Sequence, residues 1–245
     1  AWWVWTLLGI GGVSGIAGVL FALAQHDLKR LLAYHSVENI GIICLGLGLW
    51  LLGTSTGNST LAALGLLGGL LHVWNHAIFK SLLFLGAGAV VHATGTRDME
   101  KLGGLLKRMR HTGLSFLVGS AAISGLPPLN GFVSELLIYL GAFSAVASGG
   151  PTHAAVAGAV GIGALAMIGG LAAACFAKVF GITFLGEPRS DAALAAHEAP
   201  GAMRAGFAPL AGLCVLIGLL GPLAVSAVSP AANQLLSNLA PAAER

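Results

Sequence analysis

The chain consists of long apolar stretches separated by short polar connections. Asp, Glu, Lys and Arg are almost confined to the connections. About 20 apolar residues are needed to cross about 30 Å of hydrocarbon, and the stretches meet that length. The pattern predicts an all-α membrane protein, a polytopic bundle with about six transmembrane helices, at residues 3–24, 33–52, 61–92, 113–147, 154–184 and 207–228.

Two of the predicted helices are longer than a bilayer requires. At 1.5 Å per residue, residues 61–92 would run ~48 Å and residues 113–147 ~52 Å. The second stretch contains SGLPPLNGF, in which Pro127 and Pro128 remove two amide donors. Unwound backbone at that depth is tolerated only where it is buried in protein or lines a wet cavity. We therefore predict a broken helix, interrupted near residues 125–131.

The basic residues predict an orientation for the bundle. The first, third and fifth connections hold nine of the twelve Lys and Arg residues, whereas GTSTGNST and SGGPTH hold none. By the positive-inside rule, the basic connections face the cytoplasm. Arg245 is assigned to the opposite side, and Lys80 and Lys178 lie inside predicted helices. We expect a multi-pass protein in the lipid bilayer of a bacterial or archaeal cell (inner) membrane.

Composition agrees with a membrane protein and argues against several functions. The chain is 56% hydrophobic and 9% charged, whereas soluble domains carry about 25% charged residues. The net charge of +3 is small and confined to short segments, which does not indicate nucleic-acid binding. The three cysteines lie far apart, so they form no pair typical of an iron–sulfur site or a disulfide framework. We expect no cofactor in this chain.

The chain divides into three regions. Residues 1–185 form the main bundle, residues 186–206 a cytoplasmic or interfacial loop, and residues 207–245 a final transmembrane helix and tail. The loop is the most polar segment and predicts a short interfacial helix, capped near Ser190 or Asp191. No chemistry is assigned to it. Because the chain opens on AWWVWTLL, without Met or a signal peptide, we expect it to be part of a longer protein.

The segment LHVWNHAIFKSLLFLG places His72, His76 and Lys80 inside an apolar stretch. Their spacing of four residues puts them near one face of a helix, as a ladder ~12 Å tall. Lys80 is predicted ~18 Å from the helix end at His92, close to the middle of the membrane. An ionised group there costs from ~2.5 to ~10 kcal/mol or more, so it needs a partner or releases its proton. The ladder therefore predicts a proton relay.

Other roles for the ladder stay open. The histidines could hydrogen-bond across helices while Lys80 permanently satisfies an acid, in which case all three are structural. Two histidines at this spacing could also bind a metal ion, although the sequence indicates no third ligand.

Glu135 follows the predicted helix break by one turn, which places it near mid-membrane. An acid beside a discontinuous helix is typical of ion-coupled carriers, so we assign Glu135 to proton translocation, as a partner for Lys80. The alternative is a permanently protonated carboxyl group, or one bonded to unwound backbone near Asn130.

Three more ionisable residues are candidates for proton intake or outlet. His35 and Glu38 lie one turn apart, only ~8 Å above the first connection, where a solvated helix start is the alternative. Lys178 is six residues from the end of its predicted helix. It either snorkels to the interface or serves as an outlet.

Three ordered motifs carry a family resemblance: ALAQHDLKRLLAYHSVENIGI, HAIFKSLLFLGAGAVVHATGTRDMEKLGGL and SGLPPLNGFVSE. Together they resemble the antiporter-like membrane subunits of respiratory complex I, the NADH:quinone oxidoreductase, and its relatives. The versions with His35 and Glu38 are most similar to the large membrane subunit of formate hydrogenlyase and hydrogenase-4 complexes.

The resemblance implies a bundle of two inverted repeats, with residues 1–185 in the second one. It implies that His72, His76, Lys80 and Glu135 lie on a central hydrophilic axis that translocates protons. Electron transfer would take place in partner subunits that hold nickel–iron and iron–sulfur centres, so other membrane and peripheral subunits are expected partners. Two alternatives remain, a subunit of a multisubunit cation/proton antiporter and a non-conducting scaffold for a hydrogenase arm.

Overall fold

A computed structural model describes residues 2–243, with side chains described up to residue 237. Arg245 and the end of the predicted tail lie outside the described residues. Six of the described helices, α1, α2, α3, α5, α6 and α8, are long and apolar enough to cross a membrane, which confirms the predicted polytopic bundle. The helices are α1 (Trp2–Leu23), α2 (Leu28–Thr56), α3 (Ser59–Thr94), α4 (Arg110–Ile123), α5 (Asn130–Ala147), α6 (Thr152–Phe184), α7 (Asp191–Leu194), α8 (Gly201–Leu219) and α9 (Gly221–Ala243), with short 3₁₀ turns at Met99–Lys101 and Leu105–Lys107.

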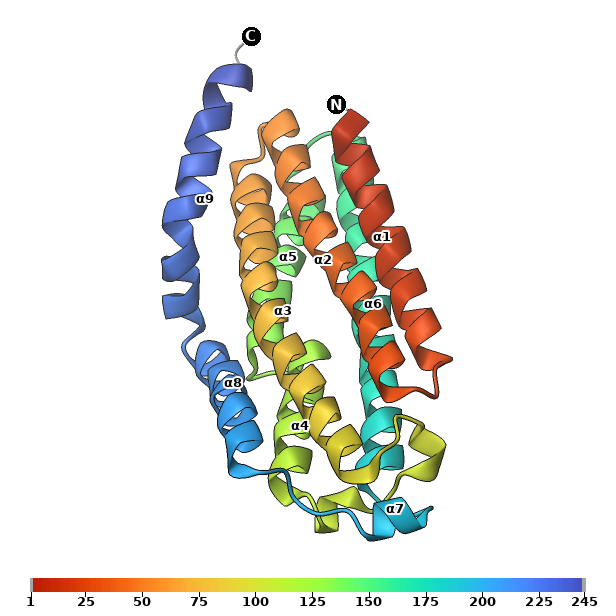
Figure 1. Cartoon of the computed structure of the whole chain (residues 1–245). Coiled ribbons are helices and arrows are strands. Elements are labelled where there is room, and N and C mark those ends of the chain that lie inside the picture. Colours follow the sequence, from red (N-terminus) through yellow and green to blue (C-terminus); the bar gives the residue numbers. More distant parts are fainter. Residues whose placement is uncertain (1, 244–245) are drawn as a thin grey trace.

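The long helices form an elongated bundle (Figure 1). α1 packs along α2, α2 packs along α3, and α6 packs against α1, α4 and α5. The connections after α1, α3 and α6 all lie at one end of the bundle, and those after α2 and α5 lie at the other. The alternation expected from the basic residues is therefore present in the fold, and we refer to the first end as the basic end.

α2 begins at Leu28 rather than at the predicted residue 33 because Asp27 caps it. The Asp27 carboxylate accepts a hydrogen bond from the Arg30 amide at 2.9 Å, so the basic pair of the first connection belongs to the first helical turn. Asp27 also pairs with Arg97 at 3.1 Å and thereby joins the first and third connections. The earlier start places the next residues of α2 deeper in the bundle than the sequence predicts.

The predicted break lies between α4 and α5 and is confirmed. Gly125 in the break has φ +63°, a left-handed conformation that favours glycine. A Cβ at Gly131 would overlap the carbonyl oxygen of Ala122, so the two half-helices meet closely only with glycine at this position. α3, in contrast, is a single helix of 36 residues, about 54 Å long.

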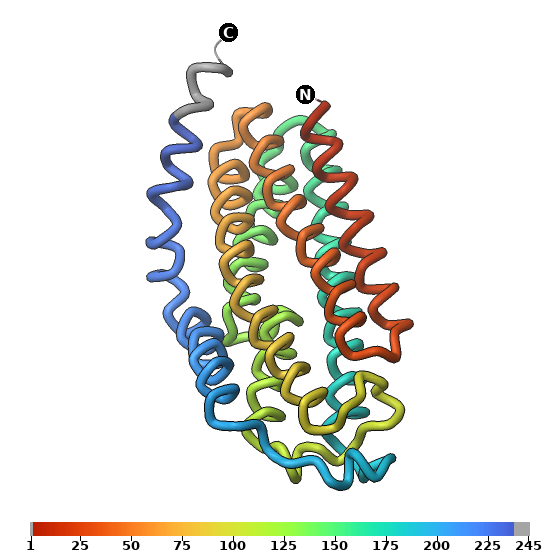
Figure 2. Tube along the Cα trace, viewed as in Figure 1, coloured from red at the N-terminus to blue at the C-terminus, as the bar shows by residue number. Residues whose placement is uncertain are grey.

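The C-terminal part differs from the predicted single helix over residues 207–228. α8 ends at Leu219, and α9 begins at Gly221, with Pro222 in its first turn. Proline is tolerated in a first turn but lacks the amide that would continue α8, which explains the interruption. Both helices pack on α3 (Figure 2). The predicted short helix in the polar loop is α7, and its cap is confirmed because Ser190 Oγ accepts from the Ala193 amide at 3.2 Å.

Candidate functional site

Buried polar side chains from α2, α3 and α5 gather inside the apolar bundle. Polar groups at such depth are costly unless they are hydrogen-bonded, so their partners define the site. Lys80 is 6% exposed and Glu135 7% exposed. The others are at most 1% exposed: His35, Glu38 and Asn39 from α2, His72 and Asn75 from α3, and Asn130 and Ser134 from α5.

His35 and Glu38 form a buried pair on α2. Nδ1 of His35 contacts the Glu38 carboxylate directly. The His35 ring packs on Phe176 of α6, with ring centroids 4.6 Å apart. The interpretation of these residues as a solvated helix start is wrong, because the earlier start of α2 puts Glu38 about 15 Å into the helix. The structure brings the two candidate intake residues together in the core.

A chain of hydrogen bonds connects this pair with the broken helix. Asn39 donates from Nδ2 to the His35 carbonyl at 2.7 Å, which leaves its Oδ1 facing Nε2 of His72 at 3.1 Å. On the other side of the ring, Nδ1 of His72 lies 2.9 Å from Ser134 Oγ. The chain therefore runs from the His35 carbonyl of α2 through α3 to the second turn of α5.

Ser134 allows His72 to be either neutral or protonated. Its hydroxyl lies 3.0 Å from the Gly131 carbonyl and accepts a hydrogen bond from Asn75 Nδ2 at 3.0 Å. When His72 is neutral, Nε2–H donates to Asn39 and the Ser134 hydroxyl donates to Nδ1. When His72 is protonated, Nδ1–H donates to Ser134 and the hydroxyl turns to Gly131. Rotation of one hydroxyl thus satisfies both states.

Lys80 reaches across to α2. Its Nζ donates to the carbonyl of Leu32, and the ammonium lies 5.3 Å from the centre of the Phe84 ring. The buried Glu38 lies on the same helix as Leu32. Lys80 is therefore hydrogen-bonded to the helix that carries the His35–Glu38 pair.

The predicted partners Lys80 and Glu135 are not joined by a direct ion pair. Among the described residues the two form no ion pair. Ser134 faces α3, and successive residues of a helix are turned by about 100°, so Glu135 points toward α6 instead.

Glu135 faces a cavity of about 320 Å³ between the helix break and α6. Its carboxyl group packs on Gly125, where an added Cβ would lie 3.0 Å from Glu135 Cδ. Tyr139 and Ser124 supply polar groups to the lining, and α6 contributes small residues: Ala166, Gly169, Gly170 and Ala173. The Glu135 carboxyl group therefore lies between Gly125 and a space large enough for water.

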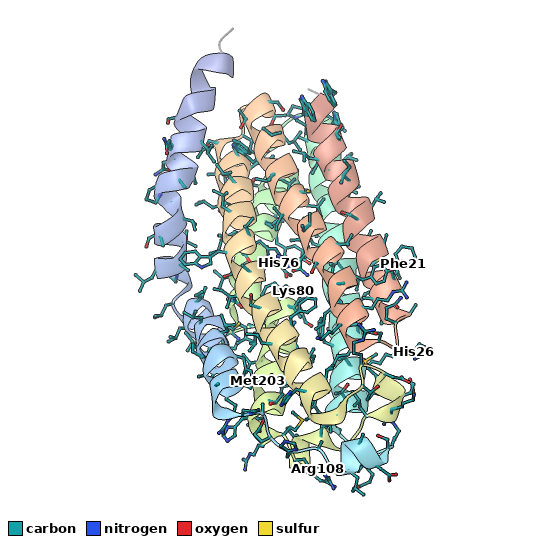
Figure 3. The ribbon with its side chains drawn as sticks, viewed as in Figure 1. Phe21, His26, His76, Lys80, Arg108 and Met203 are labelled. Atoms are coloured by element: carbon teal, nitrogen blue, oxygen red, sulfur yellow. The ribbon has the colours of Figure 1, made fainter. Side chains whose placement is uncertain are left out.

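His76 and Lys178 take less part in this network. His76 is half-buried, its ring packs edge-on against Phe79 at 5.7 Å, and its Nε2 has no hydrogen-bond partner within residues 2–237. Figure 3 shows His76 and Lys80 about halfway along the bundle. Lys178 donates to the Leu23 carbonyl at 2.9 Å, at the C-terminal end of α1, where a cation is favoured.

Neutral residues that complete the network were not among the sequence candidates. Asn39 and Ser134 bond to His72 directly, and Asn75 donates to the Asn130 carbonyl at 2.7 Å. Asn39 lies four residues after His35 and Asn75 three after His72, so each shares a helix face with a candidate. From that spacing the side chains of Asn39 and Asn75 could have been predicted as parts of the network.

We expect Glu38→Gln to destabilise the folded protein by about 3 kcal/mol, because breaking a buried pair leaves its other member uncompensated. Thermal unfolding of the full-length protein in detergent measures this. The matched control is Glu100→Gln, whose carboxylate pairs with His26 at 3.1 Å on the surface, and it should change stability by less than about 1 kcal/mol. Equal melting temperatures for the two variants would contradict the buried pair.

A family model described as NADH:quinone oxidoreductase/Mrp antiporter, TM, matches residues 1–162. The chain belongs to this family. Every residue of the network, and Glu135, lies in the matched region of this NADH:quinone oxidoreductase/Mrp antiporter family member, whereas Lys178 lies beyond it. The assignment confirms the resemblance inferred from the three motifs and identifies an integral membrane protein.

Two relatives of this family member come from Escherichia coli (strain K12). Hydrogenase-4 component B is 48% identical over 218 residues, which cover 89% of this chain and 32% of the relative. Formate hydrogenlyase subunit 3 is 47% identical over 221 residues, which cover 90% of this chain and 36% of the relative. The chain thus spans about a third of the length of these relatives.

The fold of this family member is also found in a solved structure, that of the Mrp complex from Dietzia sp. DQ12-45-1b. The TM-score is 0.77 at 22% identity, and the likeness covers 94% of this chain and 46% of that chain. At this identity the likeness establishes a shared fold.

Proposed function

We propose that this chain is part of a proton-translocating membrane subunit of a membrane-bound hydrogenase or complex I-like oxidoreductase. The observation that carries the proposal is the set of buried hydrogen-bonded groups inside the bundle. It consists of the His35–Glu38 pair on α2 and, beginning at the His35 carbonyl, the chain of Asn39, His72 and Ser134 that reaches the broken helix. Ionisable residues within membrane helices are costly and mark ion pathways. Membership of the family supports the same function.

In this proposal Glu38, Lys80, His72 and Glu135 hold protons in turn. An ionised Glu38 stabilises the ammonium of Lys80, so a change of charge at one group alters proton binding at the other. His72 takes and gives a proton at Nδ1, where the Ser134 hydroxyl adapts to both states. Glu135 exchanges protons with the cavity beside α6.

The electron transfer that drives this movement takes place in partner subunits, which hold nickel–iron and iron–sulfur centres. The partners are further membrane and peripheral subunits of a hydrogenase or complex I-like assembly. The basic end of the bundle faces the cytoplasm of a bacterial or archaeal cell, in accordance with the positive-inside rule.

A cation/proton antiporter subunit is the second candidate function. It is favoured by the family, which includes Mrp antiporters, and by the fold shared with the Mrp complex. The same buried groups would then exchange protons for a metal cation, with no redox partner.

Inverted vesicles that contain the full-length protein in its native complex separate these functions. We expect acidification of the vesicle interior when electrons are supplied, and its collapse on addition of an uncoupler. Proton movement driven by a sodium or potassium gradient alone would instead favour the antiporter. A complex that assembles and transfers electrons without any proton movement would overturn the proposal in favour of a scaffold.

Ser134→Ala should slow proton translocation about 100-fold, because no hydroxyl then adapts to the protonation of His72. Ser134→Thr keeps the hydroxyl and should retain most of the rate. The control is Ser144→Ala on the same helix, whose Oγ donates to the Gly141 carbonyl at 2.7 Å outside the network. Initial rates of vesicle acidification measure all three, and equal rates for Ser134→Ala and Ser144→Ala would contradict the role of Ser134.

A further inference from the structure

The polar segment at residues 186–200, here called the strap, is fastened to the connection between α3 and α4. Lys107 Nζ pairs with the Glu187 carboxylate at 2.7 Å. Arg108 donates from Nε to the Leu194 carbonyl at 2.7 Å, and Ser190 donates to the Lys101 carbonyl at 2.7 Å. Figure 1 shows the strap crossing the basic end below α4. The segment therefore has a defined place against the first half of the broken helix.

Glu198 of the strap caps α4, which has no side-chain cap of its own at Met109. One carboxylate oxygen accepts from the His111 amide at 2.6 Å and the Thr112 amide at 3.4 Å, and the other accepts from the Thr112 hydroxyl at 2.6 Å. The first amides of a helix need such acceptors, and the helix dipole favours a negative charge there.

These contacts stabilise the negative charge of Glu198. Partial burial by itself opposes the charge, but the hydrogen bonds from the Thr112 hydroxyl and from the amides of Ala199, His111 and Thr112 keep the pKa of Glu198 below its ordinary value. Glu198 is therefore an ionised cap at neutral pH.

The helix break is held on its α5 side by the helix that follows the strap. α8 packs on α4 and α5, and Gly218 near its end touches the backbone of the helix break. A Cβ at Gly218 would lie 2.6 Å from Leu129 Cα and would overlap the carbonyl oxygen of Pro128. Because these atoms belong to the backbone, they cannot turn aside as the tip of a side chain can.

We propose that Glu198 and Gly218 are positioning residues and form a clamp on α4 and the break. Glu198 holds the start of α4 and Gly218 holds the α5 side of the break, and together they keep the break against Glu135. The link to Glu135 is Gly125, which follows α4 and touches the Glu135 carboxyl group. A shift of α4 by one residue, about 1.5 Å along its axis, would remove that contact. The importance of Glu135 for proton movement rests on the proposed function, whereas the clamp on α4 does not.

Hydrogen–deuterium exchange of the full-length protein tests the clamp. Glu198→Gln keeps the size of the side chain but sets an NH₂ group against N–H donors, and Gly218→Ala places a methyl group against the break. We expect the amides within residues 110–129, outside the two prolines, to exchange about 10-fold faster in each variant, because one variant loses a helix cap and the other displaces the backbone of the break. The controls are Asp191→Asn, at an exposed acid on the same strap, and Gly212→Ala, on an open face of α8, and both should leave exchange unchanged.

Proton translocation by the same variants tests the link to Glu135. We expect the pH profile of vesicle acidification to shift by about one unit in Glu198→Gln and Gly218→Ala, and not in the controls. Unchanged exchange at residues 110–129 would overturn the clamp, whatever the proton assay shows. Faster exchange with an unaltered pH profile would overturn the link to Glu135. Absence of proton movement in the wild type would instead overturn the proposed function, and exchange would still decide the clamp.

Discussion

Glu135→Gln is expected to abolish proton translocation while the protein still folds and assembles. The amide has nearly the same size as the carboxyl group, so the packing on Gly125 and the cavity beside α6 are kept. An amide cannot bind and release a proton near neutral pH. We expect the rate of vesicle acidification to fall by at least about 100-fold, the usual effect of removing a positioned proton-transfer group.

Among the described residues that line the cavity, Glu135 is the only acidic one. It is the only acidic residue between Glu100 and Glu187 in the sequence, and the groups that line its cavity besides the carboxyl are hydroxyls and apolar side chains. Glu187→Gln is the control for loss of an acid, because that residue lies on the strap and pairs with Lys107. Undiminished acidification by Glu135→Gln, with normal assembly, would contradict the assignment of Glu135.

The fold follows closely from the sequence where one physical effect dominates. The length of the apolar stretches predicts the membrane helices, because only helices satisfy the hydrogen bonds of the backbone in lipid. Pro127 and Pro128 predict the break, because they lack the amides that a continuous helix needs. The start of α2 is harder to predict from the sequence, because Lys29 and Arg30 look like loop residues until Asp27 is recognised as a helix cap. The end of α8 is similarly hard to predict, because Pro222, which interrupts the helix, has apolar residues on both sides.

The sequence predicts which ionisable residues belong to the site, but it does not predict which of them contact one another. His72 and Lys80 can be predicted as site residues because they are among the few polar residues of the apolar stretch that forms α3. Which side of α5 faces α3 depends on the geometry of the break, and for this reason the sequence does not show that Ser134 faces α3 while Glu135 faces α6. The cap from Glu198 joins residues almost ninety positions apart, and no local pattern predicts such a contact.

The two lysines inside the long helices provide a matched comparison. Each donates to a backbone carbonyl of a neighbouring helix, Lys80 to Leu32 and Lys178 to Leu23. Lys80 lies on α3, the helix that contributes His72 to the network, whereas Lys178 lies on α6 and caps the end of α1. Replacing either lysine by methionine removes one ammonium and one hydrogen bond and keeps a similar volume.

The central claim, that protons move along the buried groups of α2, α3 and α5, is tested most directly by vesicle acidification in Lys80→Met and Lys178→Met. Electron transfer and assembly are measured in the same preparations. We predict that Lys80→Met lowers the acidification rate at least about 100-fold, while Lys178→Met keeps at least about half of it, the modest loss expected for a residue outside the pathway. Equal loss in both variants, or full acidification by Lys80→Met, would contradict this pathway.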